Sequence, residues 1–378
     1  MFDDNMGIAD DTCTVVSEEN EVVDEELQNG DVEDAEVSLD DSEDDAISAK
    51  SIYDLLEEDI MGSDLPMQEK AERLSRLIKV REKKANIILV GATGSGKSST
   101  VNALFNMEVA KVGVGVDPET VTITSFELEN LTIWDTPGLG DGIKNDESYN
   151  RMLIDKLSEL DENGDPLIDL VLVVLDASSK DLGTSYDLIN NIIIPCLEDD
   201  KENRIIVGLN QADVAMKGKH WDSEKNEPDE VLLDYLKKKS ESVRNRIFEG
   251  TGLNIRPIFY SAGYKEEGGE QSKPYNLTKL LYYIIKAMPK DKRLALADNI
   301  NPDADNWLFD DEEQQYKEYI KTSIWDSIST YVWIETNIWS GAGADIGDKI
   351  LGIPGKAVGF LIGGACGAVK GFFEGLFG

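Results

Sequence analysis

The sequence predicts a mixed α/β fold, in which a mostly parallel six-stranded sheet with one antiparallel edge pair is covered by helices on both faces. Three observations predict this fold. Six apolar runs recur between residues 86 and 262, helical patterns separate most of them, and two neighbouring runs are joined by only two residues. Alternating strands and helices favour parallel pairing, whereas a two-residue connection favours a hairpin.

The bounds of the expected elements follow from the spacing of apolar residues. NIILVG and RIIVGL are unbroken apolar runs, as in strands buried on both faces. TVTITSFEL and LTIWD, with only Glu129 and Asn130 between them, should form the hairpin. The expected strands are 86–91, 120–128, 131–135, 167–177, 204–209 and 255–262, and the expected helices are 97–106, 147–161, 184–198, 228–249 and 276–287.

Other segments flank the domain that these elements define over residues 85–289. Residues 1–50 hold 19 acidic residues and a single basic one, which predicts a disordered acidic tail that acts as a solubilising spacer or as a docking site for a basic partner. Residues 290–312 have the composition of a linker. Residues 313–378 should form a helical C-terminal module, because apolar and aromatic side chains recur there near helical spacing.

A helical lead-in is expected over residues 51–84. Its clearest part runs from Pro66 to Lys84, where apolar residues share one helical face. Ser63 and Asp64 are candidate caps just before it. The apolar residues of this face are Ala71, Leu74, Leu77 and Ile78.

Composition and charge exclude several function classes. The net charge of −38 repels phosphate backbones and anionic lipid, so direct nucleic-acid binding is not expected. The three cysteines lie far apart, which fits a reducing, cytoplasmic location, and a single histidine, His220, leaves little room for histidine catalysis. The acidic N-terminus lacks the apolar segment of a secretory signal.

The segment GATGSGKS, Gly91 to Ser98, fits the P-loop pattern between a predicted strand and a predicted helix. Glycines let backbone amides approach phosphate oxygens closely, and the helix start adds its positive dipole end. Lys97 should reach the β- and γ-phosphates, and the Ser98 hydroxyl should bind Mg²⁺. The expected phosphate-binding set is Gly91, Thr93, Gly94, Ser95, Gly96, Lys97, Ser98 and Ser99.

WDTPGLGDG, Trp134 to Gly142, supplies a second constellation at the end of the hairpin. Asp135 is placed to hold Mg²⁺ through water, and the Gly138 amide can sense a γ-phosphate. The segment before the hairpin carries two threonines. Thr120 is the first choice for a residue that closes over the metal in the triphosphate state and Thr122 the second, although both could be ordinary strand threonines.

The order of these motifs, followed by NQAD at 210–213 and SAG at 261–263, resembles the five signature motifs of Ras-like and Era-like GTPases over residues 85–288. The resemblance is greatest to bacterial, often prophage-borne Era-like GTPases, whose names often mention the 50S ribosome. It implies binding of GTP and GDP with Mg²⁺ and hydrolysis of GTP to GDP and phosphate. Ribosome binding is not carried over, because this chain is acidic and shows no RNA-binding module.

The resemblance also implies how a base is recognised. The Asp213 carboxylate would accept two hydrogen bonds from guanine, and Asn210 would brace the loop. Gln211 stands where the family has a lysine that covers the purine, so guanine recognition should survive with weaker affinity. The backbone N–H of Ala262 would donate to guanine O6, with Ser261 beside it.

Hydrolysis should be slow. Leu139 stands where Ras-like proteins have a water-orienting glutamine, a departure that Era-like families share. The expected catalytic residues are Lys97, Thr120 and Gly138, and the expected metal ligands are Ser98, Thr120 and Asp135. Acceleration by a homodimer or another partner is a hypothesis. The alternatives are a GTP-binding scaffold, a dynamin-like or immunity-related membrane GTPase, and a P-loop ATPase or kinase.

The C-terminus contains a glycine ladder, with glycine at 355, 359, 363, 367, 371 and 375. Glycine at every fourth position lets two helices approach closely. The longest uncharged run, Ala357 to Val369, is shorter than the ~20 residues that a bilayer requires. Membrane insertion or interfacial docking, packing within an oligomer or against the main domain, and disorder remain the alternatives for this segment.

Overall fold

The computed structural model describes residues 51–105, 107, 111–113, 123–138, 143–198, 200–263, 272–333 and 366–377, all of which belong to one compact unit, Ala49–Gly378. Several expectations lie outside the described residues: the acidic tail, both candidate switch threonines, Leu139 and the first half of the glycine ladder. For these segments the expectations stay as predictions.

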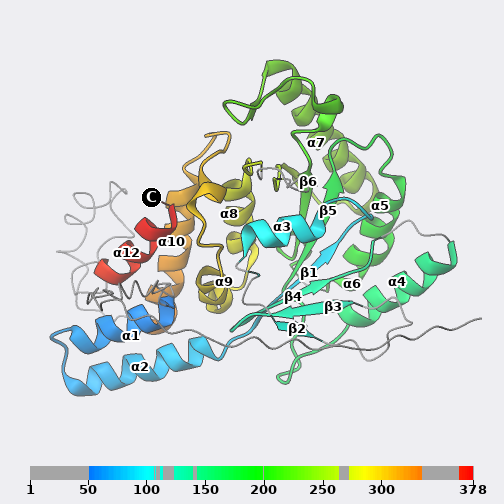
Figure 1. Cartoon of the computed structure of the whole chain (residues 1–378). Coiled ribbons are helices and arrows are strands. Elements are labelled where there is room, and N and C mark those ends of the chain that lie inside the picture. Colours follow the sequence, from blue (N-terminus) through cyan, green and yellow to red (C-terminus); the bar gives the residue numbers. More distant parts are fainter. Residues whose placement is uncertain are drawn as a thin grey trace, which may run out of the picture. The chain divides into compact units, whose positions relative to one another are not determined.

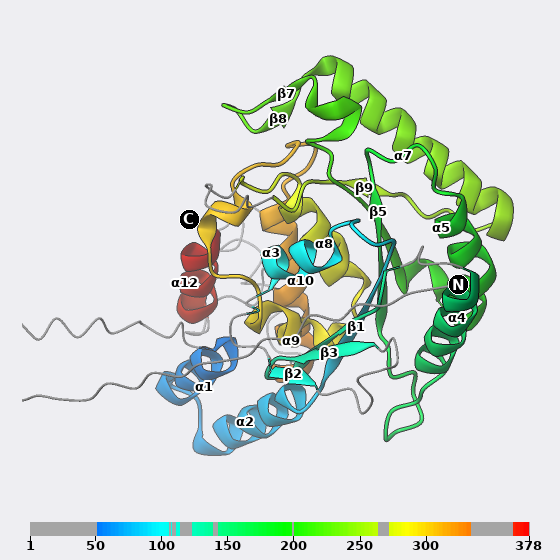
Figure 2. The ribbon, with the colours of Figure 1, turned by 45° about the vertical axis from the view of Figure 1, so that its right-hand side comes forward.

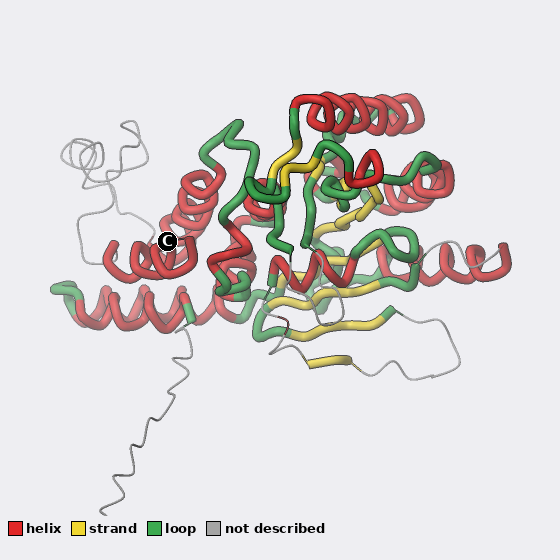
Figure 3. The backbone as a smooth tube through the Cα atoms, turned by 45° about the horizontal axis from the view of Figure 1, so that its top comes forward, coloured by secondary structure: helices red, strands yellow, loops and turns green. Residues whose placement is uncertain are grey.

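The central sheet has seven strands in the order β2-β3-β4-β1-β5-β6-β9 (Figure 1). Five strands are parallel, and β3 and β2 are added antiparallel at one edge. Figure 3 shows the strands (yellow) side by side, with helices (red) around them. The strands are β1 (Ala85–Val90), β2 (Lys111–Gly113), β3 (Thr124–Glu127), β4 (Leu131–Asp135), β5 (Leu170–Asp176), β6 (Ile205–Asn210) and β9 (Ile258–Phe259).

This arrangement confirms the predicted α/β class and the β3–β4 hairpin, with one correction. Six strands were expected, but β2 adds a seventh and makes a second antiparallel pairing. A three-residue strand, Lys-Val-Gly, has no periodicity to detect, and backbone pairing with β3 defines it. β9 is also shorter than the predicted 255–262 and follows Pro257, which has no N–H for a ladder.

Alternate side chains of the central strand β1 point into two separate cores. Ile87 and Leu89 join the core on the face of α3 (Lys97–Leu104) and α8 (Leu277–Ala287). Ile88 and Val90 join the core on the other face, under the helices shown together on the right of Figure 2. Because successive strand side chains face opposite sides, one apolar run fills both layers. The second layer holds α4 (Ile143–Leu157), α5 (Gly183–Leu188) and α7 (Glu230–Thr251).

The helix expected over 184–198 contains a π-helical turn. α5 runs into the π-helix η2 (Ile189–Ile193), and the short α6 (Ile194–Cys196) follows. Pro195 cannot donate a backbone hydrogen bond to the preceding turn, and its ring crowds that turn. The proline therefore explains why regular α-helical bonding is interrupted just before it.

Further helices extend the α3–α8 side of the sheet. They bury residues such as Leu56, Ile320 and Phe373 in the same core as α8, so they do not form a separate domain around a core of their own. The expected lead-in is a pair of helices, and Ser63 ends the first of them while Pro66 caps the second, so the predicted caps Ser63 and Asp64 were wrong. These helices are α1 (Ile52–Gly62), α2 (Met67–Arg81), α10 (Tyr316–Ile328), η7 (Ser329–Trp333) and α12 (Cys366–Phe377).

The segment 290–312, expected as a linker, is part of the packed structure. It forms α9 (Arg293–Asp298) and the 3₁₀ turn η6 (Ala304–Trp307), and Trp307 is completely buried. The polar run NPDAD dominates the composition of this segment, so the apolar residues on either side of it did not indicate a packed structure. Burial of Trp307 and of the α9 side chains in the α8 core therefore decides the structure of this segment.

The described end of the glycine ladder packs through its large residues. Phe373 and Phe377 on α12 are buried, and Phe377 meets Trp307 edge to face with 6.1 Å between ring centroids. Gly371 and Gly375 are exposed, and a Cβ at either would meet nothing within 4 Å. Within the described part of the chain, these two glycines therefore do not mediate close helix packing. In the described part of the chain, no helix is both long and apolar enough to cross a bilayer.

A buried ion pair ties the segment after α8 to the sheet. Lys292 Nζ lies 2.7 Å from Asp169 Oδ1, and Asp169 Oδ2 accepts a 2.8 Å hydrogen bond from the Asn86 backbone. Burial raises the pKa of Asp169, and the nearby Lys292 opposes that rise. The ion pair with Lys292 therefore offsets part of the cost of burying this carboxylate.

We predict that Lys292→Met, which keeps the aliphatic stem, lowers the free energy of unfolding by about 3 kcal/mol at neutral pH, because it leaves a buried carboxylate without its cation. Without the lysine, the folded-state pKa of Asp169 rises further above its unfolded value. Protonation then removes the penalty, so the deficit relative to wild type should shrink as pH falls through that pKa. Urea unfolding at neutral and acidic pH measures this.

The matched control is Lys290→Met, which removes an exposed pairing with Asp326 and should change stability by less than about 1 kcal/mol. An equal loss in both variants, or a Lys292→Met deficit that does not depend on pH, would contradict the buried-pair account.

Candidate functional site

The loop between β1 and α3 has the backbone conformation that the P-loop motif requires. Gly94 and Gly96 have φ angles of +77° and +87°, in the left-handed region that favours glycine. A side chain at Gly91 would collide with the carbonyl of Val174, and one at Gly96 would collide with the Asn210 amide. The loop therefore curls tightly against β5 and β6 before α3 begins at Lys97.

Side-chain donors hold three successive carbonyls of this loop. Gln211 Nε2 donates to Gly94 O at 2.7 Å, and Asn210 Nδ2 donates to Ser95 O at 3.0 Å. Thr100 Oγ1 donates to Gly96 O at 2.8 Å. With these carbonyls occupied on one side, the concave side of the loop is left to its amides, which is the arrangement that binds an anion.

Lys97 completes the loop. Its side chain is 8% exposed, and its ammonium donates to Gly91 O at 3.1 Å and to Ala92 O at 3.3 Å. Burial lowers the pKa of Lys97, and the neighbouring Asp135 carboxylate opposes that shift. A desolvated cation next to loop amides interacts strongly with phosphate, because little water must be removed when the anion arrives.

Asp135 at the end of β4 has a carboxylate whose surroundings suit a metal ion. Its Oδ2 accepts a 3.4 Å hydrogen bond from Ser98 Oγ, whereas its buried Oδ1 has no hydrogen-bond partner among the described residues. Burial raises the pKa of Asp135, and Lys97 and Ser98 lower it. Two oxygen ligands suit Mg²⁺, which keeps several waters and substrate phosphates. No group of three His, Cys, Asp or Glu side chains gathers as a metal cluster within the described ranges.

The strand β4 leads into Thr136, which joins the loop to the sheet and to α4. Thr136 Oγ1 lies 2.7 Å from Leu89 O and 3.1 Å from the hydroxyl of Tyr149. Gly138 follows in contact with the P-loop, since any side chain there would collide with Thr93. The structure therefore brings Gly138 next to the Gly91–Ser98 loop.

The NQAD and SAG segments meet at the carboxyl ends of β6 and β9. Asn210 is buried, and its Oδ1 accepts a 3.0 Å hydrogen bond from Ala262 N. Gln211 has a φ of +63°, which turns its side chain toward Gly94. The same Ala262 N–H was expected to donate to guanine O6, and here it donates to Asn210. To play both roles, the Ala262 N–H would have to be shared between Asn210 Oδ1 and guanine O6, or pass from the first acceptor to the second.

The structure thus brings the P-loop residues, Asp135, Gly138, Asn210, Gln211, Ser261 and Ala262 to one edge of the sheet, and it leaves Asp213 half-buried just beyond them. Thr93, Ser98 and Ser99 are exposed on the loop and the first turn of α3. Sequence reasoning missed Thr100 and Tyr260, whose hydroxyls lie 2.7 Å apart beneath this site. Thr100 follows the motif by two residues, and only the structure shows what it contacts.

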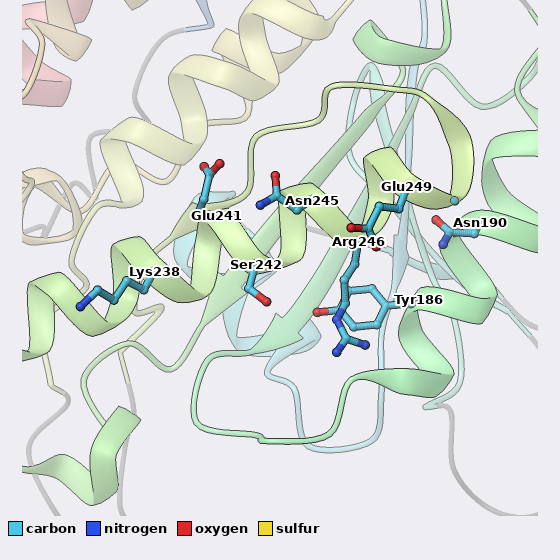
Figure 4. A pocket seen from close by; sticks show the side chains of 9 residues that line it. Tyr186, Asn190, Lys238, Glu241, Ser242, Asn245, Arg246 and Glu249 are labelled. Carbon is cyan, nitrogen blue, oxygen red and sulfur yellow. The ribbon is translucent and has the colours of Figure 1, made fainter.

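A separate cavity of about 820 Å³ lies elsewhere on the molecule, between α7 and the α5–η2 helix (Figure 4). It is lined by polar and charged side chains, and Arg246 stacks over the ring of Tyr186 at 5.3 Å. None of its lining residues belongs to the motifs above. It is therefore distinct from the candidate nucleotide site.

Comparison with known proteins points to the same segment. Residues 86–211, a third of the chain, match the family model described as "50S ribosome-binding GTPase". Human Septin-12 is 41% identical over 80 residues, which cover 18% of this chain and 22% of that protein. Septin-8 of Xenopus tropicalis is 40% identical over 86 residues, covering 21% of this chain and 20% of that protein. The chain thus spans about a fifth of the length of these relatives.

Solved structures with a similar arrangement are more distant. Toc33 from Arabidopsis thaliana is 16% identical with a TM-score of 0.39, covering 64% of this chain and 97% of that chain. A probable GTP-binding protein, engB, is 18% identical with a TM-score of 0.32, covering 54% of this chain and 98% of that chain. Likenesses at this level carry no inference about function. The family match and the fold together identify residues 86–211 as part of a P-loop GTPase G domain.

Proposed function

We propose that this chain binds GTP and GDP with Mg²⁺, hydrolyses GTP to GDP and phosphate, and acts as a nucleotide-dependent switch of the Era-like kind. The observation that carries the proposal is the direct bonding of NQAD to the P-loop, in which Asn210 and Gln211 hold the carbonyls of Ser95 and Gly94. A segment that recognises a base and a loop that binds phosphate, joined in this way, suit a single ligand that has both a purine and a phosphate tail.

The phosphate end is assigned to the loop amides between Gly91 and Ser99 and to Lys97. The ammonium of Lys97 donates to two loop carbonyls. A phosphate would replace those neutral acceptors with a charged one, which makes shorter and stronger hydrogen bonds. Lys97 is thereby held in place before the ligand arrives, and charge that develops on the γ-phosphate would be stabilised with little reorganisation.

The metal is assigned to Ser98 and Asp135, with Thr120 added in the triphosphate state. The buried Oδ1 of Asp135, which has no hydrogen-bond partner among the residues that the structure describes, supports this assignment, since a buried carboxylate oxygen is costly unless a cation or donor satisfies it. When bound, Mg²⁺ would neutralise charge on the phosphates. Asp135 and Ser98 would orient it, and Gly138 would contact the γ-phosphate beside Thr93.

The base end is assigned to Asp213, with Asn210 as the brace and Gln211 and Ala262 at the edges. Guanine offers N1–H and an amino group to a carboxylate, whereas adenine would leave it unpaired. Gln211 has no charge and a shorter stem than lysine, and it already donates to Gly94 O. We therefore expect it to stabilise the loop more than the purine face.

We predict that Asp213→Asn weakens GTP binding at least about tenfold and reduces the preference for GTP over ATP, because it removes a charged double acceptor. Competition calorimetry with both nucleotides measures this. Asp187→Asn, an exposed carboxylate on α5, is the control and should leave both affinities unchanged. An unaltered GTP to ATP ratio in Asp213→Asn would argue for a P-loop ATPase or kinase instead.

We predict that Asp135→Asn abolishes the enhancement of GTP affinity by Mg²⁺, while binding measured in excess chelator stays within about threefold of wild type, since the amide cannot supply the charge that the metal needs. The control is Asp59→Asn on α1, another carboxyl whose pKa is raised by burial. A full Mg²⁺ effect in Asp135→Asn would remove this residue from the metal site.

We predict slow GTP hydrolysis in single-turnover phosphate release, with Lys97→Ala falling to the uncatalysed background. Leu139 cannot orient water, so positioning must come from the P-loop and the metal. Specific activity that rises with protein concentration would support acceleration in a homodimer. Wild type that releases no more phosphate than Lys97→Ala would instead identify a binding scaffold.

A further inference from the structure

Tyr260 lies directly between the end of β9 and the SAG segment, and it is completely buried. Its ring packs across β6 at Gly208, where an added Cβ would lie 2.7 Å from the ring carbon Cε1. A contact that close is possible only because residue 208 is glycine. Glycine at 208 therefore leaves the space that the Tyr260 ring occupies, with its hydroxyl next to Thr100 of α3.

The hydroxyl of Tyr260 reaches the P-loop through one intermediate. It lies 2.7 Å from Thr100 Oγ1, and Thr100 Oγ1 donates to Gly96 O at 2.8 Å. Threonine has a single hydroxyl proton, which this geometry assigns to Gly96 O, so the phenol must be the donor to Thr100. Burial raises the pKa of Tyr260, so the phenol keeps that proton at neutral pH.

The backbone of Tyr260 is joined to the base side of the site. Its carbonyl accepts a 3.1 Å hydrogen bond from Ala212 N, and its N–H donates to Leu209 O at 2.9 Å. Ser261 and Ala262 follow immediately. One residue thus bonds to NQAD through its main chain and, through its side chain, to Thr100, which in turn bonds to the P-loop.

We propose that Tyr260 is a positioning residue, which holds the base-reading segment and the P-loop at one fixed separation through the Tyr260–Thr100–Gly96 chain of hydrogen bonds. The inference rests on the proposed function, because it concerns a ligand that spans both ends. Packing alone does not require these hydroxyls, since Phe at 260 and Val at 100 would fill the same space. A buried hydroxyl pair that also bonds a loop carbonyl serves to orient that loop.

A ligand that spans both ends gains from this orientation, whereas one that touches only the P-loop gains less. The bonds of Asn210 to Ser95 O and of Gln211 to Gly94 O would still join the two halves. Loss of the chain would loosen their alignment, and binding of a full nucleotide would then have to restore it. GDP represents a ligand that spans both ends, and inorganic pyrophosphate represents one that contacts only the P-loop.

The test is calorimetric affinity of GDP and of inorganic pyrophosphate, each with Mg²⁺, for wild type and Tyr260→Phe. GDP should bind about threefold to tenfold more weakly and dissociate faster, as for one lost hydrogen bond, while pyrophosphate affinity should change less than about twofold. Thr100→Val should weaken GDP binding as much as Tyr260→Phe does, and the double variant should bind GDP no more weakly than either single variant. Thr100→Ser, which keeps the hydroxyl, should bind GDP like the wild type.

Tyr316→Phe on α10 is the matched control, because it also removes a tyrosine hydroxyl bonded within the fold, at 3.0 Å from Asp311. A purely structural role for Tyr260 would lower the melting temperature in both phenylalanine variants and leave GDP affinity unchanged, and that result would overturn the proposal. Equal weakening of GDP and pyrophosphate would overturn it too. Absence of GDP binding by wild type would instead refute the proposed function.

Discussion

The carbonyls of the P-loop must be held by groups other than the ligand, and the rest of the site depends on this constraint. Gly94, Ser95 and Gly96 make a tight turn whose amides can face an anion only if their carbonyls are satisfied elsewhere. Gln211 and Asn210 supply the bonds to Gly94 O and Ser95 O, whereas Gly96 O accepts from both the backbone N–H and the hydroxyl of Thr100. Because the side chains of Asn210 and Gln211 lie at the end of β6, the segment proposed to read the base also braces the loop proposed to bind phosphate.

The sheet makes that arrangement possible. Parallel order brings the carboxyl ends of β1, β4, β5, β6 and β9 to one edge, so motifs spread over more than a hundred residues meet there. Apolar cores on both faces keep the strands in register. The outer helices extend the core on the α8 side of the sheet. The Lys292–Asp169 ion pair also attaches the segment after α8 to the start of β5.

Electrostatics reinforce the local character of the site. A chain of net charge −38 repels a nucleotide at long range, so attraction must come from short-range groups. Lys97 is desolvated beside loop amides, and Asp135 has a raised pKa and an unpartnered oxygen that suit a divalent cation. Backbone dipoles, one buried lysine and a metal can bind phosphate where the overall field is unfavourable.

The sequence by itself determined the α/β class, the hairpin, the main helices and the positions of the signature motifs. These properties depend on residues that are close together in the sequence, because both apolar periodicity and a strand–loop–helix motif are patterns of neighbouring residues. Only the tertiary structure decided that β2 pairs with β3, that 290–312 is buried around Trp307, and that Gly371 and Gly375 face away from the core. Tyr260 and Thr100 belong to the same group: their hydroxyls meet across 160 positions of the chain, and such contacts leave no periodicity in the sequence.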